Sequence, residues 1–144
     1  MTFGESINVC LRQKYATFQG RATRSEFWWF ALFMAIVNTV INTIGTIATG
    51  ASIMSTFNPD SLSEFGGGLL GGIGTIIFFI ISLIVGLYFI IPSIAVTVRR
   101  LHDTNRSGWW YLIILIPFIG GLVLFVFTLL ASDPNDNEYG PYEA

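Results

Sequence analysis

Three long apolar runs dominate the pattern of the chain, and short polar segments separate them. The runs cover residues 27–48, 73–98 and 109–131, and none of them contains Asp, Glu, Lys or Arg. As α-helices rising about 1.5 Å per residue they would extend roughly 33, 39 and 35 Å, and a hydrocarbon core is about 30 Å thick. The pattern therefore predicts transmembrane helices at about 26–49, 73–100 and 109–131.

An amphipathic segment precedes the first run. Apolar residues recur at helical spacing between Phe3 and Phe18, polar residues occupy the other faces, and Gly20 is placed to end a helix. We expect an interfacial helix over about 3–19, lying in the plane of the lipid headgroups. With the three spans, this makes the chain an all-α integral membrane protein with a single membrane domain over residues 1–144.

The remaining polar segments connect these elements. The link 50–72 contains NPD, SLSEF and GGG. These motifs predict a turn, a short surface helix beginning near Asp60 or Ser61, and a flexible joint. Residues 101–108 are expected to form a hairpin between the second and third spans, and residues 132–144 a polar, acidic tail.

Composition agrees with a lipid environment, and the charges set an orientation. Charged residues make up 11% of the chain, against about 25% in typical soluble domains. All seven basic side chains lie either between Arg12 and Arg24 or between Arg99 and Arg106. By the positive-inside rule, the N-terminus and the 101–108 hairpin are cytoplasmic and the 50–72 link is outside. An odd number of spans then places the acidic tail outside as well.

Two kinds of residue inside the spans carry structural information. Asn38 and Asn42 share one helical stripe with Gly45 and Thr49, and we expect this stripe to pack against protein, because amides are costly in hydrocarbon. Pro117, followed by two glycines, should bend the third span. The only cysteine is Cys10, and no His/Cys ligand set accompanies it, so neither a disulfide, a metal site nor a cofactor is predicted.

The stretch RRLHDTNRSGWW, residues 99–110, is the densest polar cluster. Asp103 could pair with Arg99 or Arg106, one turn away on either side. Glu26 should lie at the same membrane depth as Arg99 and Arg100, and we expect an interhelical ion pair with one of them. Glu26 also closes a capping-box pattern that begins at Thr23. The aromatic belt at the membrane interface is predicted to consist of Trp28, Trp29, Trp109 and Trp110.

Three interpretations of this cluster remain open. The first is anchoring alone, with hairpin-locking contacts among Glu26, His102 and Asp103. The second is a site for an anionic lipid or partner, if guanidinium groups converge with free donors. Its candidate contacts are Arg21, Arg24, Arg99, Arg100 and Arg106. The third is catalysis, with His102 as acid or base and Asp103 as its orienting partner, but adjacent side chains make a poor dyad, so no catalytic residue is assigned.

Four motifs together resemble a known family. They are FQGRATRSEFWWF from Phe18, RRLHDTNRSGWW from Arg99, IPFIGG from Ile116 and NEYGP from Asn137. In this order and at these separations they resemble the bacterial inner-membrane family called domain of unknown function 805. The resemblance covers nearly the whole chain and implies a small helical protein of the plasma membrane. It carries over no reaction, cofactor or catalytic residue.

The leading functional hypothesis is a non-enzymatic plasma-membrane protein that binds a lipid or a partner through its basic and aromatic cytoplasmic layer. The expected ligands are membrane lipids, in particular anionic ones, and a homo-oligomer or a membrane-protein partner is allowed. No nucleic-acid partner is expected. The alternative is a small-solute transporter or transporter subunit, and an enzyme acting on lipid headgroups through His102 comes last. The predicted localisation is the bacterial inner membrane, multi-pass, with the N-terminus in the cytoplasm.

Overall fold

The computed structural model describes residues 1–56 and 64–142, and the side chains at 48, 50–56 and 64–71 lie outside this description. Within the described residues, all the secondary-structure elements are helices. Two compact units make up the fold: unit 1 is Met1–Phe33 with Phe89–Ala144, and unit 2 is Met34–Tyr88. The helical elements support an all-α membrane protein.

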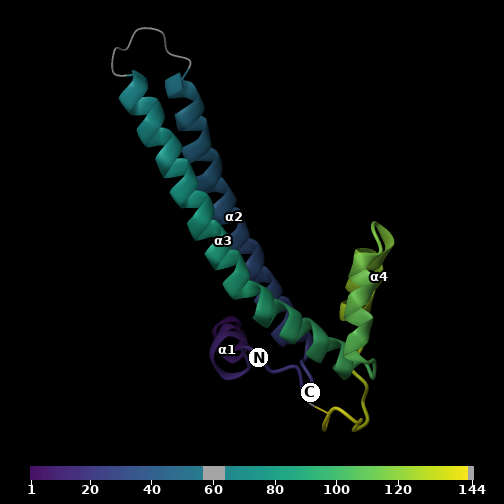
Figure 1. The fold of residues 1–144 in the computed structure, drawn as a ribbon. Helices are drawn as coiled ribbons and strands as arrows, with labels where there is room; N and C mark the ends of the chain where they lie inside the picture. Colours follow the sequence, from purple (N-terminus) through teal and green to yellow (C-terminus); the bar gives the residue numbers. More distant parts are fainter. Residues whose placement is uncertain (57–63, 143–144) are drawn as a thin grey trace. The chain divides into compact units, whose positions relative to one another are not determined.

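Unit 2 consists of segments of the two longest helices, α2 (Arg24–Thr56) and α3 (Glu64–Asp103), which run side by side (Figure 1). A Cβ built on Gly45 would lie 2.7 Å from the ring of Phe78, so a larger residue at position 45 would require this ring to move. Both helices contain a stretch long and apolar enough to cross a membrane, Arg24–Ile47 and Gly72–Asp103. The first two predicted spans are thus present as helices of sufficient length.

The link between these helices is more helical than expected. The predicted flexible joint at residues 66–68 belongs to α3, so that prediction is wrong. The helix is continuous there because the apolar residues that follow extend one regular element. The start of the expected surface helix, near Asp60 or Ser61, lies outside the described residues.

The N-terminal helix of unit 1 is shorter than predicted. It comprises α1 (Phe3–Asn8) and a π-helical turn, η1 (Val9–Gln13), and it does not reach residue 19. Thr2 and Glu5 form a capping box at its start. Gly20 does not end this helix, but it adopts a positive φ of 86° in the following loop. Lys14 ends it instead, because its φ of −124° and ψ of 36° leave the helical region.

Local signals fix where α2 begins and where α3 ends. The backbone N–H of Glu26 donates to the Thr23 hydroxyl at 3.2 Å, which caps the start of α2. At the other end, Asn105 has a positive φ of 56°. The N–H of Arg106 donates to the Leu101 carbonyl, and that of Asn105 donates to the His102 carbonyl. This is a Schellman motif, in which asparagine takes the left-handed position that glycine usually fills.

The third apolar run does not form one continuous helix, which corrects the prediction. A 3₁₀ helix, η2 (Gly108–Leu115), is followed by a reversal and then by α4 (Ile119–Leu129). The two segments pack on each other, and the rings of Trp110 and Phe127 meet at 5.6 Å. At about 2.0 Å and 1.5 Å per residue, each segment extends only about 16 Å, roughly half a hydrocarbon core. Three spans are therefore not established, and neither segment is long enough to cross alone.

The reversal has three local causes. Pro117 lacks a backbone N–H and restricts the residue before it, so the helix cannot continue. Phe118 adopts a positive φ of 66°. A Cβ built on Gly120 would lie 1.7 Å from the Ile113 carbonyl oxygen, so glycine is required where the chain doubles back. The bend predicted at Pro117 is therefore a complete reversal.

The acidic tail packs against the end of α3, which was not expected. The N–H of Asp133 donates to the Asp103 carbonyl at 2.8 Å, and the Asn137 amide donates to the His102 carbonyl at 3.0 Å. Residues 101–108 and the tail thus occupy the same end of unit 1. The prediction that the tail lies across the membrane from that hairpin is wrong, because the run between them turns back.

Candidate functional site

Five charged side chains form a buried cluster at the centre of unit 1: Arg21, Glu26, Arg99, Arg100 and Asp103. Arg21 is 3% exposed, and the other four are fully buried. They come from the loop before α2, the first turn of α2 and the last turns of α3. We call this set the arginine cluster. It holds three cations and two anions, and backbone carbonyls accept from several of the remaining donors, but among the described residues Arg99 Nε and Glu26 Oε2 are buried without a hydrogen-bond partner.

One half of the cluster is built around Glu26. Arg99 NH1 donates to Glu26 Oε1 at 2.5 Å, which is the interhelical pair expected between Glu26 and one of the two arginines. The Ser6 hydroxyl donates to the Glu26 carbonyl at 2.5 Å, and Cys10 Sγ lies 3.8 Å from Glu26 Oε1. Burial, and then the charge of Glu26, raises the pKa of Cys10 to about 11. The N-terminal helix is therefore held against α2 and α3 through its Ser6–Cys10 face.

The other half is built around Asp103. Arg21 Nε donates to Asp103 Oδ1 at 2.9 Å, and Arg100 NH1 binds Asp103 Oδ2. The Ser132 hydroxyl donates to the same Oδ2 at 2.5 Å. Asp103 therefore pairs with Arg21 and Arg100, and not with the expected Arg99 or Arg106. One carboxylate joins the loop before α2, the end of α3 and the start of the tail.

Arginine donors also satisfy the C-terminal end of α4. Arg100 binds the carbonyls of Thr128 and Leu130, and Arg24 binds those of Leu129 and Leu130. The last carbonyls of a helix have no partner within the helix and carry partial negative charge, which favours a cation there. These bonds hold the returning end of the 108–129 segment at the cluster.

Arg21 ties the tail to the same cluster. Its NH1 and NH2 groups donate to the carbonyls of Asn135 and Asp133 at 2.8 and 2.6 Å. Its guanidinium also lies 5.7 Å from the ring centre of Tyr142. The tail is therefore recognised mainly through its backbone, and its acidic side chains do not provide these contacts.

His102 is held apart from Asp103. Its Nδ1 lies 3.2 Å from the Gly20 carbonyl, which can only accept, so Nδ1 is the donor. Its ring stacks on the ring of Tyr139, with 3.9 Å between the two ring centroids and an interplanar angle of 3°. Because the Asp103 carboxylate faces two arginines, the His102–Asp103 dyad does not form. In the neutral ring, Nε2 is left as an acceptor.

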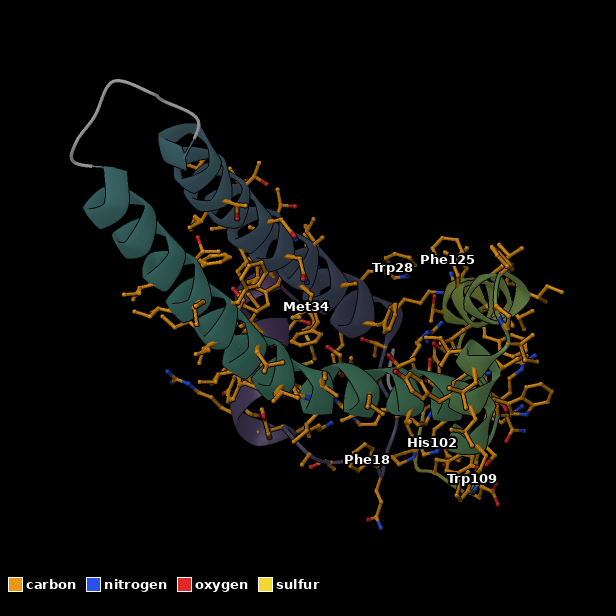
Figure 2. The ribbon with its side chains drawn as sticks, turned by 45° about the horizontal axis from the view of Figure 1, so that its top comes forward. Phe18, Trp28, Met34, His102, Trp109 and Phe125 are labelled. Atoms are coloured by element: carbon orange, nitrogen blue, oxygen red, sulfur yellow. The ribbon has the colours of Figure 1, made fainter. Side chains whose placement is uncertain are left out.

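A cavity of about 590 Å³ opens beside His102. Figure 2 shows His102 with Phe18 and Trp109 at the end of α3. The lining residues are mostly apolar or aromatic, and none is a lysine or arginine: Phe18, Ile94, Val98, His102, Ser107, Gly108, Trp109, Tyr111, Leu112 and Tyr139. A hydrogen bond with Glu138 raises the pKa of the Tyr139 phenol, which places a carboxylate at the rim. We call this space the interfacial cavity.

The five candidate arginines do not converge as free donors. Arg21, Arg99 and Arg100 are buried in the cluster, and Arg24 caps α4. Arg106 donates to the Thr104 carbonyl and lies 4.5 Å from the ring centre of Phe127. The four predicted interface tryptophans are all exposed, and Trp28 meets Phe125 of α4 at 5.8 Å (Figure 2).

Several residues of the site were not predicted from the sequence. Ser6 and Cys10 are four residues apart and therefore share one helix face, which was a usable signal. Ser132 and Tyr139 reach the site only because the third apolar run reverses, and no local pattern around them indicates this.

The comparisons with known proteins agree with this architecture. The model of the family described as protein of unknown function (DUF805) matches residues 15–141. The chain belongs to the DUF805 family. Over 129 residues it is 39% identical to the inner membrane protein YhaH of Escherichia coli, covering 90% of the chain and 88% of the relative. It is 35% identical to the inner membrane protein YhaI of the same organism over 128 residues, covering 89% and 86%. No solved structure matches significantly.

The family match confirms the resemblance seen in the sequence motifs. With the apolar helices, it establishes this DUF805 chain as an α-helical protein of the inner membrane. The matched range contains all five residues of the arginine cluster and every residue that lines the interfacial cavity.

Proposed function

We propose that this protein is a non-enzymatic lipid-binding protein that crosses the inner membrane twice, with its N-terminus, arginine cluster and tail in the cytoplasm. The positive-inside rule supports this orientation, because the basic residues gather in unit 1. The 108–129 segment enters the membrane from the cytoplasmic side and returns to it. Its two segments, η2 and α4, pack on each other, and the residues of the reversal between them are exposed.

The observation that carries the proposal is the interfacial cavity. Its volume of about 590 Å³ is in the range of small-molecule sites, about 300–1,000 Å³. Its apolar wall comes from the inner part of α3 and from η2, and its aromatic and polar groups lie near the chain's interfacial tryptophans. This distribution fits a molecule with an apolar tail and a polar head. The arginine cluster keeps the cavity in shape by fixing α3, the loop before α2 and the tail.

The chemistry of the cavity favours an ammonium headgroup. Aromatic faces attract cations, and Trp109, Tyr111 and Tyr139 line the space. Nε2 of His102 can accept an N–H, and Glu138 adds a negative charge at the rim. Because the arginines are engaged elsewhere, an anionic headgroup would meet no lysine or arginine in this lining. Phosphatidylethanolamine is the lipid class that this lining fits.

Native mass spectrometry of the purified full-length chain tests the proposal. We expect one phosphatidylethanolamine per chain to survive delipidation, and to be retained about tenfold better than phosphatidylglycerol, which has the phosphate but no ammonium. Ile94→Trp fills the cavity and should abolish retention. Ile91→Trp, on the same helix but not in the lining, should not. Loss of all lipid from the unmodified chain would refute the site, and preferential retention of phosphatidylglycerol would refute its ammonium selectivity.

A further inference from the structure

Five polar side chains follow one another along α2 within its apolar span, and all are exposed in the single chain: Asn38, Thr39, Asn42, Thr43 and Thr46. We call them the α2 polar face. The sequence predicts that Asn38 and Asn42 pack against protein, but within the described part of unit 2 no other element covers them. A bare polar face toward lipid is unfavourable, because hydrocarbon offers amides no hydrogen-bond partner.

The threonines of this face are satisfied and the asparagines are not. Each threonine hydroxyl donates to the carbonyl four residues before it, at 2.8 Å. Asn38 donates one N–H to the Met34 carbonyl, and Asn42 donates one to the Asn38 carbonyl. An amide offers two donors and an acceptor oxygen, so each keeps one N–H and one oxygen for another partner. Each of the two amides can thus donate one more hydrogen bond and accept one more.

We propose that a second copy of this chain covers the α2 polar face. All copies insert in the membrane with one orientation, so a two-fold axis along the membrane normal sets each residue opposite its own counterpart at the same depth. Asn42 then meets Asn42 of the second copy, and the spare donor of one amide meets the spare oxygen of the other. An unrelated helix would need matching amides at the same depths, whereas a second copy supplies them by identity.

The surface beside the amides suits close helix packing. A groove of about 520 Å³ runs between α2 and α3 within unit 2, and Asn42 and Thr46 belong to both the groove and the polar face. Gly45 and Ser82, two small residues of the kind common at helix–helix interfaces in membranes, belong to its lining. Apolar side chains of the second copy can enter this groove next to the amide pair, which excludes lipid from the hydrogen bonds. This inference does not depend on the lipid site.

Cysteine crosslinking in native membranes tests the geometry. Thr46→Cys should form a disulfide-linked dimer under mild oxidation, because the two-fold axis brings the pair together. Ile44→Cys should not, because residue 44 points away from the polar face, almost diametrically opposite on α2. The native Cys10 is buried, so the unmodified chain serves as the blank. Equal crosslinking at both positions, or a Thr46→Cys adduct with a different protein, would overturn the proposal.

Dimerisation of the full chain in liposomes, followed by single-molecule photobleaching over a range of protein densities, tests the energetics. Asn42→Leu should weaken the dimer about tenfold, as expected for the loss of one intramembrane amide pair. The substitution favours insertion, so folding is preserved. Ile44→Leu is the matched control and should leave dimerisation unchanged. A chain that stays monomeric at every density, or an Asn42→Leu dimer as tight as the unmodified one, would contradict the proposal.

Discussion

Removing the charge of Asp103 should strongly destabilise the half of the arginine cluster that is built around it. Asp103→Asn keeps the size of the side chain but leaves Arg21 and Arg100, both nearly or fully buried, without their anion. Removing one partner of a buried ion pair costs about 3–5 kcal/mol, and whole-protein stability is typically about 5–15 kcal/mol. Because both arginines keep carbonyl partners, we expect about 3 kcal/mol.

The assay is equilibrium unfolding of the purified chain in mixed micelles, monitored by tryptophan fluorescence. The four tryptophans all belong to unit 1, so the signal reports on the unit that contains the cluster. Asp136→Asn is the control, because Asp136 is exposed and, within the described residues, accepts a hydrogen bond only from the Tyr142 N–H, and it should change stability by less than about 1 kcal/mol. A stability of Asp103→Asn within about 0.5 kcal/mol of the unmodified chain would show that the Asp103 pairs do not hold unit 1 together.

Three further predictions follow from single contacts. Cys10, with its pKa raised from 9.0 to about 11, should react with iodoacetamide at pH 8 about 100-fold more slowly in the folded than in the unfolded chain. Glu26→Gln should speed the folded reaction, and equal folded and unfolded rates would contradict the buried position. Gly120→Ala should cost at least about 1–3 kcal/mol of unfolding free energy, whereas Gly121→Ala, whose Cβ meets nothing within 4 Å, should be neutral or stabilising. Equal effects would exclude the reversal at Gly120. Asn105→Val should lower the free energy of unfolding by about 1–2 kcal/mol, because valine disfavours the left-handed conformation, and Asn105→Gly should not lower it. An Asn105→Val chain as stable as the unmodified one would contradict the left-handed conformation of residue 105.

The sequence was sufficient to predict contacts that depend on membrane depth or on the spacing of residues within one helix. Glu26 and Arg99 both lie at the ends of apolar runs on the same side, so their pairing follows from the positions of the two runs. The Thr23 cap follows from its distance to Glu26 along one helical turn. In both cases one regular helix fixes the relevant spacing.

The contacts of Asp103 and the course of the third run needed the structure. Arg21 lies in a loop, where no periodicity gives its direction, so its pairing with Asp103 could not be predicted. A hydropathy pattern shows that residues 109–131 are apolar and long enough to cross a membrane once. It does not show whether the backbone reverses within them. Pro117 and Gly120 were visible signals of a bend. How far the chain turns depends on the positive φ of Phe118 and on the approach of Gly120 to Ile113, and neither follows from the residue types alone.

Cysteine accessibility on the two sides of the membrane tests the central claim most directly. Asn105→Cys in the hairpin and Asp136→Cys in the tail are both exposed positions of unit 1. Because residues 109–131 turn back between them, an impermeant maleimide should label the two cysteines to the same extent. Neither should be labelled in intact cells, and both should be labelled after permeabilisation. Labelling of Asp136→Cys from outside, with Asn105→Cys protected, would show that residues 109–131 cross the membrane and would contradict this architecture.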